Sequence, residues 1–334
     1  MVVTLGLVAR CDNGGLGSMT WEAWRHLQPA RTLVVRSTGP ACGSPHPVRY
    51  LDGPGEVRLT GARPTPADAR WLCDGATVVY SAETWYGPAI PTAARRRVRT
   101  VLHAMPEYWA PDVQADLLLA PTDWEPPPSS RQLPVPVATD RFTPRCVDRV
   151  RTIYHISSPA QDRNGTALLL AALRHLPHPV RVLIRQAGRG RTAPRSERIG
   201  HATVEWLPHH DGPYWEAWPA EVDALVMPRR FAGLSLPMQE AAAQGLPIIT
   251  LDRAPENAWL PPAALVPARP VGRVVTWRRR SVELWDAAPA DLAARIDALT
   301  AMPALAAELS TASKLWAEQL AWPRWVDTYR EVLG

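Results

Sequence analysis

Residues 227–249 read MPRRFAGLSLPMQEAAAQGLPII, and the order of their parts indicates the architecture of the chain. An apolar segment ends at Pro228, a glycine-containing loop follows, and a helical segment begins near Leu236 and ends at Gly245, before the apolar residues 246–251. Strand, loop, helix and strand in this order predict a parallel sheet with a crossover helix. The positive amino end of the helix faces the loop and favours an anionic ligand there, such as a diphosphate. The residues predicted to hold it are Gly233, Leu234 and Ser235.

The same alternation of strands and helices extends through the rest of the chain. The first half predicts strands at residues 2–8, 32–35, 76–80, 100–103 and 116–120, and helices at 19–27, 65–72 and 91–97. After a proline-rich loop at 125–136, strands are expected at 152–156, 180–184 and 223–227, and helices at 165–176, 236–244, 291–299 and 305–320. Residues 187–200 are rich in Gly, Arg and Ser and predict an exposed loop. The pattern indicates an α/β protein with two doubly wound domains.

Composition excludes several classes of protein. Of the 334 residues, 46% are hydrophobic and 21% charged, which argues against a mostly disordered chain. Apolar runs are too short to cross a membrane and no secretory signal is apparent, so we expect a cytoplasmic protein. The four cysteines form no CxxC pair and predict neither a zinc site nor a disulfide framework. The net charge of +5 fits a polyanionic partner, and a merely solvated basic surface is the alternative.

The stretch 227–249 resembles the donor-binding signature of GT-B glycosyltransferases, particularly glycosyltransferase family 4, whose pattern is about P-S-R-x-E-G-F-G-L-P-x-x-E-A-M-A-x-G-x-P-V-I. This resemblance implies the GT-B fold, in which two Rossmann-like domains face each other across a cleft. We expect an acceptor-side domain at 1–145, a nucleotide-sugar domain at 146–313, and a terminal helix at 314–334 that crosses back to the first domain. Glu240 matches the second acidic residue of the signature, which binds ribose. Ala232 stands where the family has its first acidic residue.

Other positions of the family pattern follow in order along the chain. Arg163 resembles the basic phosphate clamp, and Arg185 follows the next strand, although a surface role for Arg185 is the alternative. A glycine-rich loop after the first strand resembles the one that approaches the donor phosphates. Its glycines are Gly14, Gly15 and Gly17. The resemblance also places His103 and Glu107 as catalytic candidates near the acceptor, with Glu83 and Asn257 as acceptor contacts. A structural histidine and a turn-forming asparagine are the alternatives for His103 and Asn257.

The resemblance implies transfer of a hexosyl group from a UDP- or GDP-sugar, such as UDP-glucose, to a hydroxyl group. Neither a cofactor nor a metal ion is expected, because no DxD-type acidic cluster lies beside the nucleotide loop, and family 4 implies retention at the anomeric carbon. The domain-one pattern is similar to that of bacteriophage-encoded transferases, which suggests double-stranded DNA carrying a 5-hydroxymethylated pyrimidine, such as 5-hydroxymethylcytosine, as the acceptor. A protein or cell-envelope glycan acceptor, or a non-catalytic nucleotide-sugar-binding module, remains open.

Overall fold

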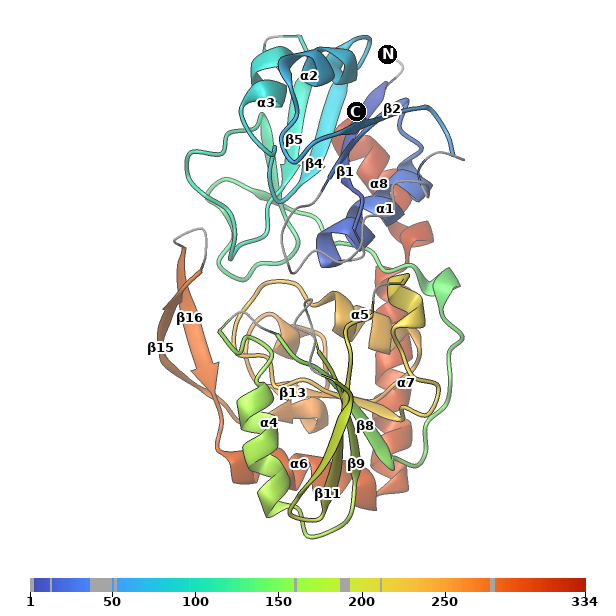
Figure 1. Cartoon of the computed structure of the whole chain (residues 1–334), viewed down its shortest axis with the longest axis vertical. Helices are drawn as coiled ribbons and strands as arrows, with labels where there is room; N and C mark the ends of the chain where they lie inside the picture. The colour runs from blue at the N-terminus through green and yellow to red at the C-terminus, as the bar shows by residue number, and fades with distance from the viewer. Residues whose placement is uncertain are drawn as a thin grey trace. The chain divides into compact units, whose positions relative to one another are not determined.

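A computed structural model describes residues 3–12, 14–36, 50, 53–95, 97–158, 161–186, 193–210, 212–276 and 280–334 (Figure 1). The chain forms two compact units, which are described separately below. Unit 1 comprises Met1–Pro136, Val275–Arg280 and Trp322–Gly334, and unit 2 comprises Val137–Val274 and Ser281–Ala321. The end of the chain therefore belongs to the first unit. No helix within the described residues is long and apolar enough to span a membrane.

Unit 1 contains a parallel sheet with the strand order β3-β2-β1-β4-β5-β6-β7. The chain order reverses between β1 and β4, which is where open α/β sheets bind ligands at the carboxyl ends of their strands. Helices α2 and α3 pack together, as do α1 and α8, and the two pairs lie on opposite sides of the sheet (Figure 1). The strands are β1 (Leu5–Arg10), β2 (Arg31–Val35), β3 (Glu56–Thr60), β4 (Val78–Ala82), β5 (Arg99–His103), β6 (Leu117–Ala120) and β7 (Arg131–Gln132), and the helices are α1 (Gly15–Leu27), α2 (Pro66–Cys73), α3 (Ala89–Ala94) and α8 (Trp322–Leu333).

Unit 2 contains a second sheet with the strand order β10-β11-β9-β8-β12-β13-β14, in which only β10 runs antiparallel. The chain order reverses here between β8 and β12. The strands are β8 (Thr152–Ile156), β9 (Arg181–Arg185), β10 (Arg195–Ile199), β11 (Ala202–Leu207), β12 (Ala224–Val226), β13 (Ile248–Leu251) and β14 (Leu265–Val266), and the helices are α4 (Thr166–Ala172), α5 (Leu236–Ala243), α6 (Pro289–Ala301) and α7 (Pro303–Leu320). Strands β15 (Arg269–Val275) and β16 (Ser281–Asp286) form a separate hairpin. Two doubly wound parallel sheets confirm the predicted fold class.

The core of unit 2 follows from the sequences of its strands. Strands β8, β9, β12 and β13 are almost continuously apolar and buried, as expected for parallel strands covered by helices on both faces. Helix α5 is also buried along nearly its whole length, from Met238 to Ala243. Such an arrangement leaves the carboxyl end of β12 and the amino end of α5 fixed in place, and the predicted diphosphate loop joins these two ends.

Candidate functional site

The loop between β12 and α5, which we call the donor loop, is held at both ends. Ser235 caps α5, and its side-chain hydroxyl accepts a hydrogen bond from the Met238 N–H at 3.4 Å. The neighbouring loop between β8 and α4 comes close, because a Cβ on Gly165 would lie 2.2 Å from the Pro228 carbonyl oxygen. Gly165 also has a φ of +73°, so the position requires glycine for two reasons. The Arg230 N–H donates to the Arg163 carbonyl at 2.8 Å and joins the two loops.

The two helix amino ends beside this site differ in charge. Asp162 precedes the first turn of α4, and its carboxylate accepts the N–H groups of Thr166 at 2.7 Å and Ala167 at 3.2 Å. Helix α5 is capped instead by the neutral hydroxyl of Ser235. Because a carboxylate already offsets the positive end of α4, α5 is the better location for a bound anion.

Glu240 lies on α5 one turn beyond its amino end and is 9% exposed. Its Oε2 accepts a hydrogen bond from the Trp218 indole at 3.0 Å, and the Trp218 ring packs against Tyr154 at a centroid distance of 5.1 Å. Burial raises the pKa of Glu240 from 4.5 to about 7, and the hydrogen bond from Trp218 partly opposes this shift. A buried, hydrogen-bonded carboxylate beside the switch point is compatible with binding of ribose hydroxyls. The ribose-binding role of Glu240 stays a prediction.

Arg185 is engaged within the protein. Its guanidinium donates from Nε to the Tyr154 hydroxyl at 3.1 Å, from Nη1 to the Pro208 carbonyl at 3.0 Å and from Nη2 to the Ala217 carbonyl at 3.0 Å. These bonds brace the segment that carries Trp218, and so support Glu240 indirectly. A direct phosphate contact from Arg185 and the alternative surface role both stay predictions, and the bonds described here give the side chain a bracing role within unit 2.

Ala232, at the position of the family's first acidic residue, is fully buried and has a φ of +124°. Backbone in this region is strained for any residue other than glycine. Three charged side chains surround this part of the loop, namely Arg229, Arg253 and Glu256, and sequence reasoning identified none of them as site residues.

In unit 1, the glycine-rich segment begins at a buried aspartate. Asp12 accepts a hydrogen bond from the Gly14 N–H at 2.8 Å and from Arg10 Nε at 2.7 Å. A Cβ on Gly17 would lie 1.9 Å from the Asp12 carbonyl oxygen, so only glycine fits there. Gly15 and Gly17 belong to helix α1 rather than to a loop, which moves the start of the predicted helix from 19 back to 15.

The carboxyl ends of β1 and β4 bring together a polar cluster in unit 1. Glu83 follows β4 with a φ of +65°, and its N–H donates to the His103 carbonyl at 2.8 Å. Tyr86, also at positive φ, is half-buried with its hydroxyl oxygen inside the protein. Burial raises the pKa of this hydroxyl, Arg10 opposes the shift, and Glu83 and Asp12 add to it. The predicted acceptor residue Glu83 therefore belongs to a larger group, of which Arg10, Asp12 and Tyr86 were missed. Of these three, only Asp12 carries a local sequence signal, because an aspartate just before glycines is typical of a tight turn.

The two catalytic candidates are buried. His103 is fully buried, and its Nδ1 lies 3.1 Å from the Tyr80 hydroxyl and 3.5 Å from the Tyr329 hydroxyl. Burial lowers the pKa of His103 to about 3, so the imidazole is neutral near neutral pH. Glu107 is 3% exposed. Catalytic roles for both stay predictions, and the burial of His103 favours the structural alternative.

Asn257 in unit 2 is exposed at a short turn. Its side-chain Nδ2 donates to Asp252 Oδ1 at 3.0 Å, and its N–H donates to the Arg253 carbonyl at 3.0 Å. These contacts are those of a turn-forming asparagine, and contact with a donor or acceptor stays a prediction. Within the described residues, no group of three or more His, Cys, Asp or Glu side chains is placed to hold a metal ion.

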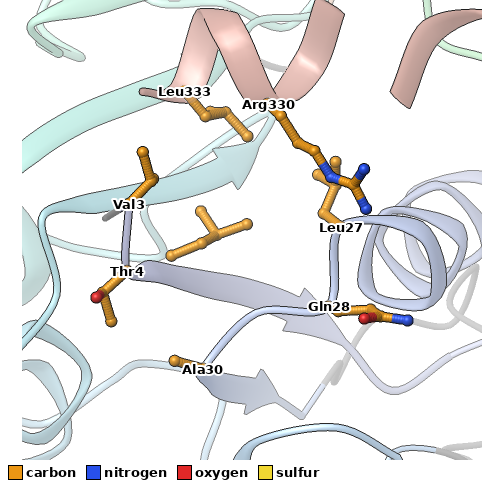
Figure 2. A pocket seen from close by; sticks show the side chains of 8 residues that line it. Val3, Thr4, Leu27, Gln28, Ala30, Arg330 and Leu333 are labelled. Carbon is orange, nitrogen blue, oxygen red and sulfur yellow. The ribbon is translucent and has the colours of Figure 1, made fainter. Parts of the chain in front are cut away.

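A cavity of about 350 Å³ lies in unit 1 at the amino end of β1 (Figure 2). Its lining mixes polar and apolar side chains, with Gln28 and Arg330 at one side (Figure 2). The remaining lining residues are Val3, Thr4, Leu5, Leu27, Ala30 and Leu333. None of the predicted site residues borders it, because those of unit 1 lie toward the opposite, carboxyl end of the strands.

Several tryptophan rings are covered by the protein's own arginines, which leaves less ring surface for stacking on a nucleic-acid base. Arginine guanidinium groups lie over the rings of Trp71 at 4.6 Å, Trp206 at 4.6 Å, Trp215 at 4.5 Å and Trp109 at 5.4 Å. The sequence also holds two arginine clusters, at 95–99 and 278–280, which could contact phosphates. They fall partly outside the described residues, because Arg96, Arg278 and Arg279 are among those not described.

Solved structures resemble the whole chain. HepE of Anabaena in complex with UDP superimposes with a TM-score of 0.68 at 11% identity, covering 99% of each chain. Sucrose-phosphate synthase from Thermosynechococcus elongatus gives a TM-score of 0.65 at 13% identity and the same coverage. A variant of TarM from S. aureus, in complex with UDP, gives 0.55 at 10% identity over 80% of this chain and 59% of that one. No protein-family model matches the chain, and no curated protein matches it by sequence. The chain therefore has the GT-B fold of glycosyltransferases.

Proposed function

We propose that this protein is a glycosyltransferase that uses a nucleoside-diphosphate sugar, UDP-glucose being the first candidate and GDP-sugars the second. The observation that carries the proposal is the site at the β8–β12 switch point. There a neutral Ser235 cap leaves the positive end of α5 available, and the buried carboxylate of Glu240 lies one turn further on. Structures of HepE with UDP and with UDP-glucose support the choice of nucleotide, because HepE has the same fold.

The proposed donor roles follow from this geometry. The loop of Gly233, Leu234 and Ser235 and the amino end of α5 hold the diphosphate, with Arg163 as a basic clamp from the adjoining loop. Glu240 accepts hydrogen bonds from the ribose hydroxyls. In transfer, the acceptor hydroxyl oxygen bonds to the anomeric carbon as the bond from that carbon to the diphosphate oxygen breaks, and the hydroxyl proton passes to the departing diphosphate. Arg163 with the helix amides offsets the negative charge that develops on that diphosphate. We propose retention of configuration and independence from metal ions.

The proposed acceptor rests on the charge of the chain and on polar residues of unit 1. A hydroxymethylated pyrimidine in DNA is supported by the net charge of +5 and by arginine-rich segments. Stacking on bases is disfavoured at four tryptophans, because an arginine guanidinium already covers each ring. These are Trp71, Trp109, Trp206 and Trp215. Glu83 and its neighbours Arg10, Asp12 and Tyr86 are the proposed acceptor-side residues, since they lie at the carboxyl ends of β1 and β4. A protein or glycan hydroxyl, and binding without transfer, are the alternatives.

Mass spectrometry of candidate acceptors tests the function. The protein is incubated with a panel of UDP- and GDP-sugars and with hydroxymethylated duplex DNA, plain duplex DNA, a protein extract or an envelope glycan. We expect a sugar to be added to one acceptor by the wild type and not by Glu240→Ala. Transfer to hydroxymethylated but not plain DNA supports the DNA acceptor, and transfer only to protein or glycan refutes it. Nucleotide binding without any transfer to the panel, and without hydrolysis of any sugar nucleotide, identifies a binding module instead.

A further inference from the structure

Three charged side chains are buried beneath the donor loop in unit 2. Arg229 is 3% exposed, Arg253 1% and Glu256 0%. The Glu256 carboxylate lies 3.0 Å from Arg253 Nη2 and 3.8 Å from Arg229 Nε, so one anion serves two cations. We call these residues the Arg–Glu–Arg cluster. Burying charges is costly, and replacing buried ion pairs by apolar residues is often neutral or stabilising, so fold stability alone does not account for the cluster.

The arginines of the cluster bind the main chain of the donor loop. Arg253 donates from Nε to the Arg229 carbonyl at 2.9 Å and from Nη2 to the Ala232 carbonyl at 2.7 Å. The Arg229 guanidinium donates from Nη2 to the Leu234 carbonyl. Hydrogen bonds from the two arginines thus fix three main-chain carbonyls within six residues of the donor loop. One of them belongs to Ala232, whose positive φ is unfavourable for alanine and persists only when its surroundings hold it.

We propose that Arg229, Arg253 and Glu256 are positioning residues that hold residues 229–235 in the shape that receives the donor diphosphate. This inference rests on the proposed function. The cluster comprises two guanidinium groups and one carboxylate, and charges in the protein interior act strongly on an anion bound at the loop because the interior screens poorly. Shape and charge are separable contributions, and the variants below alter them in different ways.

Two variants and a matched control test the cluster. Arg229→Lys keeps the charge but shortens the side chain and removes the planar fork that reaches both the Leu234 carbonyl and Glu256. Glu256→Gln raises the net positive charge, because it removes the carboxylate that lies beside both arginines. The control is Arg145→Lys, because Arg145 also donates to two carbonyls in unit 2, those of Ala220 and Val222, which lie outside the loop.

Calorimetry with UDP and with uridine gives the decisive readout. We expect Arg229→Lys to weaken UDP binding roughly tenfold, as for loss of one charge-assisted hydrogen bond, with uridine affinity unchanged, because uridine lacks the diphosphate. Glu256→Gln should also weaken UDP binding, despite its extra positive charge, because the shape of the loop dominates. Arg145→Lys should bind both ligands like the wild type.

Several results overturn the inference. UDP affinity unchanged in Arg229→Lys, an equal loss for UDP and uridine, or tighter UDP binding by Glu256→Gln would each show that the cluster does not position the loop. If Glu256→Gln does not fold, Arg229→Lys alone decides. If the wild type binds no UDP, the proposed function fails. Amide hydrogen exchange of residues 229–235 in the free protein then tests the cluster separately, since faster exchange in Arg229→Lys than in Arg145→Lys supports it and equal exchange overturns it.

Discussion

Glu240→Gln should make the protein more stable at alkaline pH. The carboxyl has a pKa of about 7 in the folded protein against 4.5 when unfolded, because burial disfavours its charged form. With the folded pKa above the unfolded one, the stability associated with this group is complete below about pH 4.5 and is lost as pH rises through about 7. At about 1.36 kcal/mol per pKa unit, this difference in pKa lowers the free energy of unfolding by about 3 kcal/mol above pH 7. The glutamine side chain of the variant stays neutral at every pH, and its amide oxygen still accepts the Trp218 N–H.

Urea unfolding followed by tryptophan fluorescence measures this effect in wild type and variant at about pH 5 and about pH 8. We expect nearly equal stability at the lower pH and an advantage for the variant of up to about 3 kcal/mol at the higher pH. Glu205→Gln is the control with the opposite sign. The Arg181 guanidinium, 2.7 Å from Glu205, lowers the pKa of that carboxyl. Its stabilising contribution is therefore present above the ordinary pKa of glutamate and is lost in acid.

A variant that is equally or less stable than the wild type at about pH 8 would refute the reasoning. That result would mean that a positive charge compensates the Glu240 carboxylate, and that burial does not govern its ionisation. If the expected gain is found together with weaker donor binding, Glu240 is a residue retained for function at the expense of stability.

Three further predictions concern other parts of the molecule. Gly17→Ala should destabilise unit 1 by about 1–3 kcal/mol in thermal unfolding, because the new methyl group would overlap the Asp12 carbonyl. Gly61→Ala is the control and should have little effect, since no atom lies within 4 Å of the place that its methyl group would take. Burial lowers the pKa of His103 to about 3, so the stabilising contribution of the neutral imidazole is present above about pH 6.5 and is lost as pH falls toward 3. Acid unfolding of His103→Leu should therefore show less of this loss of stability than the wild type. An acid transition identical to that of the wild type contradicts the prediction. Glycosyl transfer should continue in EDTA, and activity that requires added magnesium or manganese would show that a metal ion neutralises the diphosphate.

Much of the fold follows from local sequence patterns. Strand β12, helix α5 and strand β13 occur within a residue or two of where the apolar runs and Gly245 predict them. Strand β10 differs most clearly from the prediction, because the composition of residues 187–200 predicts an exposed loop where residues 195–199 form a strand. This strand is polar and exposed, and it lies at the sheet edge, where it pairs antiparallel with β11. Edge strands of this kind owe their conformation to a neighbour, which local composition does not reveal.

The candidate site could be predicted only where its residues belong to one motif. Glu240 was identified from the signature, but its partner Trp218 lies 22 residues earlier and meets it through the packing of the sheet. The contacts of Arg253 with the donor loop likewise span 21 to 24 residues. Such pairs carry no fixed spacing that a single sequence displays. For His103 the pattern showed a strand end and not its depth, because burial there depends on Tyr329 from the last helix.

The most direct test of the proposed function is calorimetric titration of the wild type, Glu240→Ala and Glu205→Ala with UDP, followed by GDP. We expect saturable binding of one of these nucleotides to the wild type, at least roughly tenfold weaker binding to Glu240→Ala, and no change in Glu205→Ala, which lies on strand β11 and pairs with Arg181. Failure of both nucleotides to bind the wild type, or equal binding to the wild type and Glu240→Ala, would contradict a nucleotide-sugar site at α5.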